Sequence, residues 1–152
     1  MSNAESDFLR QMVGDWRYAF AMTDGTYSAT GTEKVWSIGD WIAAENRGEG
    51  SDGETMHSLT VLGFNPDTGR FGGSFAGTMT AHLFVYDGVL GEDGATLPLE
   101  TEGPAIAEGK ASDRYRDVLT TIDADHRDII SQVLEADGTW REFMRWRFER
   151  AG

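Results

Sequence analysis

Residues 78–104 read TMTAHLFVYDGVLGEDGATLPLETEGP and begin with a β-rich run that has a period of two. In an extended strand, one face would carry Thr80, His82, Phe84 and Tyr86, and the other Met79, Ala81, Leu83 and Val85. One face is aliphatic, whereas the other combines an imidazole with aromatic rings. That mixture is more typical of a cavity lining than of a dry core or a solvated surface. The stretch therefore predicts a strand of a ligand-binding barrel.

Turn sequences such as Asp24-Gly25 and Asp137-Gly138 recur along the rest of the chain and supply residues that tolerate positive φ. The runs between them are about 8 to 12 residues long, a spacing typical of antiparallel all-β proteins. The candidate strands span residues 16–22, 27–38, 41–50, 54–64, 70–77, 80–90, 95–102, 112–122, 127–136 and 139–149. Because a meander avoids exposed edges by closing on itself, we predict an all-β, antiparallel up-and-down barrel of about ten strands.

One helix is predicted, at the start of the chain. Phe8, Leu9, Met12 and Val13 recur at helical spacing, Ser6 or Asp7 is expected to cap the helix, and Gly14 to end it. Such a helix could cover one end of the barrel. We expect residues 1–4 to be a cloning remnant or a disordered start, and residues 5–152 to form a single domain.

Composition narrows the range of functions. The net charge of −13 repels phosphate backbones, so we expect no nucleic-acid partner. The absence of a long apolar run and of a signal-peptide pattern predicts no membrane association and a cytoplasmic location. Cysteine is absent, and the histidines share no metal-binding spacing, so no metal and no bound cofactor is predicted. No nucleophile or nucleotide-binding motif occurs, which leaves any catalytic residue unknown.

His82 is the first candidate binding residue, because an imidazole can donate, accept or move a proton near neutral pH. Phe84 and Tyr86 share its face. On the strand at residues 41–50, Trp41 and Glu45 share a face that is either solvated or directed into the lumen. If that face is internal, Glu45 and His82 could form an acid–base pair. Two other histidines are weaker candidates: His57, expected in the core or at the rim, and His126, expected in an exposed turn.

Basic and aromatic residues near the end of the chain complete the candidate site. Arg145 lies on the face opposite Met144 and Trp146, where it would be solvated or, if internal, would clamp an anionic head group. Tyr115 and Arg116 lie on opposite faces of the strand at 112–122, so either could approach the pocket. The predicted ligand-binding residues are therefore His82, Phe84, Tyr86, Trp41, Glu45, Tyr115, Arg116 and Arg145.

Several sequence elements together resemble the DUF1579 family of bacterial proteins. They are the opening helix before Gly14-Asp15-Trp16, the run TMTAHLFVYDG with LETEGP after it, YRDV, DADHR with Ser131, and DGTWREFM before a terminal arginine. The resemblance implies a lipocalin-like or calycin-like barrel and no particular activity. Gly14-Asp15-Trp16 is similar to the glycine-x-tryptophan element of lipocalins, which implies that Trp16 packs across the closed end of the barrel.

The first functional hypothesis is a barrel that holds a small hydrophobic or amphipathic molecule. The alternatives are an enzyme that uses a His/carboxylate pair for isomerisation, dehydration or cyclisation, a haem-binding barrel, and a dry barrel with a structural role. The aliphatic face with Met79, Leu83 and Val85 would point outward. We therefore expect it to pack on the helix or on a second subunit, which makes a homodimer plausible.

Overall fold

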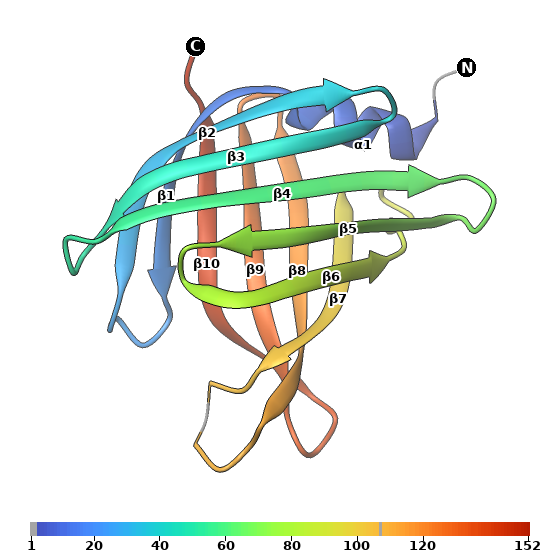
Figure 1. Cartoon of the computed structure of the whole chain (residues 1–152). Coiled ribbons are helices and arrows are strands. Elements are labelled where there is room, and N and C mark those ends of the chain that lie inside the picture. Colours follow the sequence, from blue (N-terminus) through green and yellow to red (C-terminus); the bar gives the residue numbers. More distant parts are fainter. Residues whose placement is uncertain (1–2, 107) are drawn as a thin grey trace.

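The computed structural model describes residues 3–106 and 108–152, and it is an antiparallel β-barrel with one helix at its end (Figure 1). In chain order, the elements are α1 (Ala4–Met12), β1 (Gly14–Met22), β2 (Ser28–Ile38), β3 (Trp41–Gly50), β4 (Thr55–Asn65), β5 (Arg70–Gly77), β6 (Thr80–Gly88), β7 (Thr96–Pro104), β8 (Ser112–Asp123), β9 (His126–Leu134) and β10 (Trp140–Arg150). Every predicted strand is present, with bounds that differ by at most two residues.

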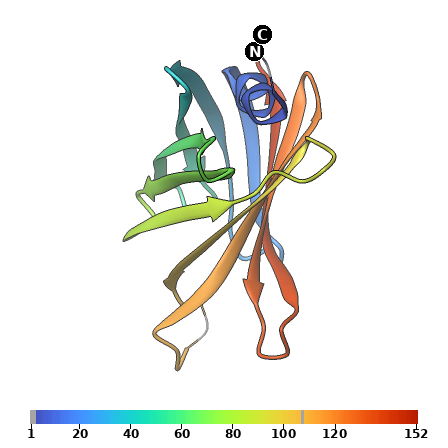
Figure 2. The same ribbon diagram turned by 90° about the vertical axis from the view of Figure 1, so that its right-hand side faces the viewer.

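Each strand pairs with its neighbours in sequence, and β1 pairs with β10 to close the barrel. The closing register runs from Trp16 opposite Arg150 to Met22 opposite Met144. The two views show β3 to β6 crossing one side of the molecule at a steep angle to β8 to β10 on the other (Figures 1 and 2). The predicted up-and-down barrel is therefore confirmed.

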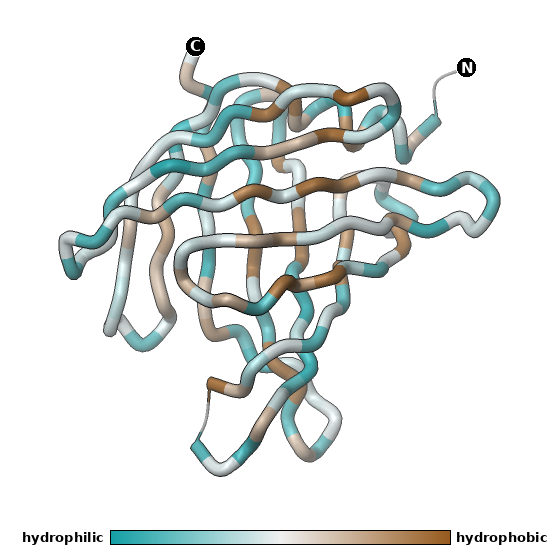
Figure 3. Tube along the Cα trace, viewed as in Figure 1, coloured by the Kyte–Doolittle hydropathy of each residue, from teal (hydrophilic) through white to brown (hydrophobic). Residues whose placement is uncertain are grey.

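Side chains alternate between the lumen and the outside along each strand. On β1, Trp16, Tyr18 and Phe20 are buried, whereas the residues between them are exposed. Brown, hydrophobic segments are interspersed with white and teal, hydrophilic ones along the strands (Figure 3). This alternation follows from the pleat, which turns successive side chains to opposite faces of the sheet. On β10 an irregularity between Glu142 and Met144 breaks the period, and both Phe143 and Met144 consequently line the lumen.

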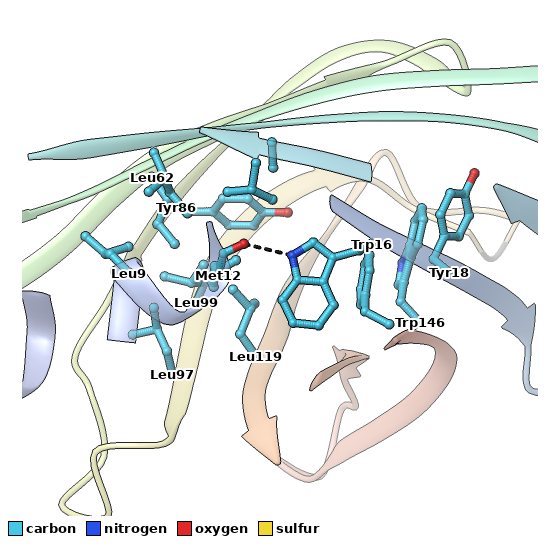
Figure 4. Packing of buried hydrophobic residues seen from close by; sticks show 14 of the residues in the cluster. Leu9, Met12, Trp16, Tyr18, Leu62, Tyr86, Leu97, Leu99, Leu119 and Trp146 are labelled. Carbon is cyan, nitrogen blue, oxygen red and sulfur yellow. Dashed lines mark hydrogen bonds between the residues drawn. The ribbon is translucent and has the colours of Figure 1, made fainter. Parts of the chain in front are cut away.

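Helix α1 closes one end of the barrel with its apolar face. Phe8, Leu9 and Met12 are buried, and the Trp16 indole N–H donates to the Met12 carbonyl over 2.8 Å (Figure 4). The structural role that the resemblance implied for Trp16 agrees with this packing. The predicted cap at Ser6 or Asp7 is wrong, because Asn3 caps the helix by accepting from the Ser6 N–H. Of the predicted disordered start, residues 1 and 2 lie outside the described ranges, whereas Ala4 begins the helix.

The joint between α1 and β1 depends on Gly14. Its φ of 133° lies in the region that favours glycine, and a Cβ there would meet a terminal nitrogen of Arg150 at 2.5 Å. The Arg150 guanidinium fills this space, where it donates to the Val13 and Gln11 carbonyls and lies 4.1 Å from the Trp16 ring. The last residue of β10 therefore ties the helix end to the barrel.

The barrel wall is incomplete between β6 and β7. Only two positions pair across these strands, Asp87 with Glu100 and Gly88 with Leu99, whereas the other neighbouring strands pair over most of their length. Beyond these two paired positions, β6 and β7 diverge (Figure 1). We call the unpaired interval, residues 80–86 of β6 and 101–104 of β7, the seam.

Over the described residues, no helix is long and apolar enough to cross a membrane.

Candidate functional site

The lumen contains a cavity of about 230 Å³. This volume corresponds to roughly eight water molecules at ~30 Å³ each, enough for a small organic molecule. Most of its wall is apolar, with large contributions from Met12, Phe75, Phe84, Leu99, Leu119, Ile129, Phe143, Trp146 and Phe148. The charged side chains of the described lining belong to two clusters.

The first cluster joins β6, β8 and β9 around Asp117. The Tyr86 hydroxyl donates to one oxygen of this carboxyl and the Ser131 hydroxyl to the other, each over 2.6 Å. Asp117 and Ser131 face each other across the β8–β9 pair, which fixes their approach. Burial raises the pKa of Asp117, while the hydrogen bonds from Ser131 and Tyr86 oppose that increase. Burial and the neighbouring Asp117 raise the pKa of the Tyr86 hydroxyl well above its usual value.

The second cluster joins β2, β3 and β9 around Glu33. Arg127 donates to one oxygen of this carboxylate, and the Asn46 side-chain amide donates to the other over 3.3 Å. The guanidinium carbon of Arg127 lies 3.8 Å from the Phe148 ring and 4.6 Å from the Trp16 ring. Arg127 is only 4% exposed, and burial lowers its pKa against the opposing effect of Glu33. Both charges are therefore paired within the barrel.

Buried polar atoms without a hydrogen-bond partner occur in the same region. Within the described residues they include Asn46 Oδ1, Thr101 Oγ1 and Arg127 Nε, which belong to residues that line the cavity. Because most buried polar atoms in folded proteins are paired, such atoms require an explanation. A polar group inside the lumen could supply the missing partners.

Three of the predicted binding residues line the cavity: Phe84, Tyr86 and Tyr115. Tyr86 reaches Asp117, whereas the Tyr115 hydroxyl donates to the Pro104 carbonyl over 2.6 Å. Whether these residues contact a ligand stays a prediction.

Of the two orientations left open for the face with Trp41 and Glu45, the solvated one is present and the lumenal one is wrong. The buried alternating set of β3 is Ile42, Ala44 and Asn46, which places Trp41 and Glu45 on the outer surface. Trp41 covers Gly63 there, since a Cβ on Gly63 would lie 2.4 Å from the indole ring. The outer face carries the charges of Glu45, Arg47 and Glu49, a pattern typical of a solvated surface. The choice of Trp41 and Glu45 as binding residues went against this pattern.

The predicted pair of Glu45 with His82 does not form. Glu45 Oε2 lies 2.8 Å from His57 Nε2, and the pKa of Glu45 is lowered chiefly by this hydrogen bond. His82 Nε2 instead lies 2.8 Å from the Glu102 carbonyl oxygen. The enzyme hypothesis in its His82–Glu45 form therefore lacks its acid–base pair. His126, predicted in an exposed turn, is exposed at the start of β9 beside Asp123.

Arg116 and Arg145 also lie outside the lumen. Arg116 stacks 4.4 Å from the Trp140 ring and donates to the Gln132 side chain, and Arg145 donates to Glu142. Neither can clamp a head group within the cavity. In the described part of the chain, the arginine that lines the cavity is Arg127, which the sequence placed at the start of the predicted strand at 127–136 and which was not chosen as a binding residue. The sequence pattern that could have indicated it is one face of β9, on which Arg127 is followed by Ile129, Ser131 and Val133.

His82 lies in the seam rather than in the cavity. Its ring contacts Glu102 on β7 and meets the Phe84 ring edge-on, with centroids 4.7 Å apart. Phe84 in turn lies against Gly103, where a Cβ would come within 2.3 Å of the ring. These two rings bridge the strands where backbone pairing is absent. On the outside, a depression follows the seam, and Thr101 borders both that depression and the cavity.

Metal and haem binding gain no support from these positions. The described residues contain no group of three or more His, Asp or Glu side chains that could hold a metal ion. The haem hypothesis depended on a histidine inside the barrel, and the described cavity lining includes none.

The fold and its lumen define a class: a ten-stranded antiparallel barrel with an internal cavity of ligand size. The model of the DUF1579 family, described as a protein of unknown function, matches residues 2–150, and the chain belongs to this family. No curated protein matches the sequence.

Solved structures share the fold at low sequence identity. Rv2717c from M. tuberculosis is 13% identical with a TM-score of 0.66, over 100% of this chain and 99% of that one. The S-type phycobiliprotein lyase CPES from Guillardia theta is 15% identical with a TM-score of 0.63, over 96% and 92%. A redesigned β-barrel, mFAP1, bound to DFHBI is 12% identical with a TM-score of 0.52, over 94% and 98%. At these identities the similarity establishes the fold alone.

Proposed function

We propose that this protein binds a small, largely hydrophobic molecule in the lumen of the barrel. The observation that carries the proposal is the cavity of about 230 Å³, whose apolar wall is interrupted by polar atoms without partners. A barrel selected only for stability would gain by filling such a space, because a cavity removes packing contacts. The fold is compatible with this function, since a designed barrel of the same fold is bound to DFHBI.

Two measurements test the proposal. Native mass spectrometry of the purified protein should reveal a retained molecule, which organic extraction would then identify. Separately, isothermal titration calorimetry with naphthalene, an uncharged apolar probe, should give saturable binding with one molecule per chain.

A matched pair of variants locates the bound probe. Thr60 lines the cavity, whereas its neighbour Leu59 is exposed on the outer face of the same strand. Thr60→Trp should fill the lumen and weaken naphthalene binding at least tenfold, and Leu59→Trp should bind as the wild type does. Equal binding by both variants, or no retained molecule together with no naphthalene binding, would refute a lumenal binding function.

A further inference from the structure

The described cavity lining contains three ionisable charges: Glu33, Asp117 and Arg127. The charge of Arg127 is already compensated, because its guanidinium donates to Glu33 and lies against the Phe148 and Trp16 rings. Asp117 has no cationic partner in the described lining and is held by two hydroxyl donors. The lumen therefore offers no free positive charge.

An anionic ligand would be unfavourable in this environment. Its head group would add a negative charge beside two carboxyl groups, in a largely apolar site where the repulsion is screened less than in bulk water. The surface adds to this effect, because the whole chain carries a net charge of −13. Fatty acids and other carboxylates are consequently poor candidates.

The buried polar atoms without hydrogen-bond partners indicate which head group the ligand would carry. Asn46 Oδ1 is an acceptor without a donor, and Arg127 Nε is a donor without an acceptor. The two side chains belong to one cluster, since Asn46 donates to one oxygen of the Glu33 carboxylate and Arg127 donates to the other. A head group that offers a donor and an acceptor next to each other would complement both atoms without bringing a charge.

We infer that the ligand of this barrel is uncharged and carries an adjacent hydrogen-bond donor and acceptor, as in an amide or lactam, bound at the cluster of Glu33, Asn46 and Arg127. This inference rests on the proposed lumenal binding and adds the chemical class of the ligand. The apolar body would occupy the space between this cluster and the rings of Phe75 and Phe84, which also line the cavity.

Three probes with the same ring system test the inference by isothermal titration calorimetry near pH 8: naphthalene, 2-naphthamide and 2-naphthoate. The wild-type protein should bind 2-naphthamide at least tenfold more tightly than 2-naphthoate and more tightly than naphthalene. This ranking needs no variant, so it does not depend on whether a substituted protein folds.

A variant pair assigns the preference to the cluster. Asn46→Leu removes the unpaired acceptor and should abolish the advantage of 2-naphthamide over naphthalene, whereas Arg47→Leu, on the outer face of the same strand, should preserve it. If 2-naphthoate binds as tightly as 2-naphthamide, or if the amide has no advantage over naphthalene, the inference is overturned while lumenal binding stands. If naphthalene does not bind, the proposed function is judged by naphthalene binding and mass spectrometry together, as described above. If none of the three probes binds, this inference is overturned as well.

Discussion

The Asp117 carboxyl group is buried in the barrel and accepts hydrogen bonds from the Tyr86 and Ser131 hydroxyls. Its pKa in the folded protein is raised above the ordinary 3.8 by burial. As the pH rises from about 4, the unfolded chain therefore releases this proton before the folded protein does. Folding stability is lost over the interval between the two pKa values, because the folded state binds the proton more tightly.

Asp117→Asn should remove this loss. The variant keeps a polar group between the two hydroxyls, so the free energy of unfolding should fall less steeply than in the wild type as pH rises from about 4 to 7. Urea denaturation at several pH values across this range measures the free energy of unfolding of both proteins. The difference between the two proteins at each pH isolates Asp117, because all other titrating groups are the same in both. Asp117→Leu is the contrasting variant and should cost about 2–4 kcal/mol, since it leaves two hydroxyls without an acceptor. Parallel pH profiles for wild type and Asp117→Asn would contradict the prediction.

Glu33 and Arg127 form a buried pair, and we expect each to depend on the other. Arg127→Met should reduce the free energy of unfolding by about 3–5 kcal/mol, because it strands the Glu33 carboxylate in the barrel. Adding Glu33→Gln to that variant should recover much of the loss. Urea denaturation of both single variants and the double variant forms a thermodynamic cycle, and strictly additive losses would show that the two residues do not interact.

At the scale of elements, the α1–β1 joint is most sensitive at Gly14. Gly14→Ala should reduce the free energy of unfolding by about 1–3 kcal/mol, because alanine is strained at this positive φ. The new Cβ should also displace Arg150 from the helix end, which adds a further loss. Gly25→Ala is a suitable control, because Gly25 also has a positive φ and no atom lies near its Cβ position. Thermal unfolding should show a larger decrease in Tm for Gly14→Ala than for Gly25→Ala, and equal decreases would rule out a role for the Arg150 contact.

The seam should be visible in hydrogen exchange. The His82 amide donates to the Thr80 hydroxyl instead of a strand partner, and the seam residues have no partner register between β6 and β7. Amides of residues 80–86 and 101–104 on the seam side should therefore exchange faster than those of the β8–β9 pair, which is paired along most of its length. Uniform protection around the barrel, measured by NMR or mass spectrometry, would contradict this prediction.

For the whole molecule, the question of a homodimer concerns the outer face of β6. Leu83 is 52% exposed and Val85 64% exposed, and α1 packs at the end of the barrel rather than on this face. The expectation that the helix covers these residues is therefore wrong, and the second subunit stays a prediction. Sedimentation should show a dimer that Val85→Lys converts to a monomer, and a monomeric wild type would exclude it.

The barrel could be predicted because a period of two and regular turns are local properties of the sequence. The cavity residues were only partly predictable. Tyr86 was chosen because His82 and Phe84 share its face, whereas Tyr115 and Arg116 were both left as candidates, of which Tyr115 lines the cavity. Trp41 and Glu45 lie on the outer face of β3, where charged residues are typical of a solvated surface. The Glu33–Arg127 pair joins positions 94 residues apart, and no local pattern indicates such a contact.

The seam has a consequence for the speed of ligand exchange. Because Thr101 borders both the cavity and the depression along the seam, local separation of β6 and β7 would add a route to solvent while α1 stays in place. His82 bridges this route through Glu102 and does not line the cavity. His82→Ala should then raise the association and dissociation rate constants by the same factor and leave Kd unchanged. In such a barrel, the residence time of the ligand is set by the wall and its affinity by the lumen.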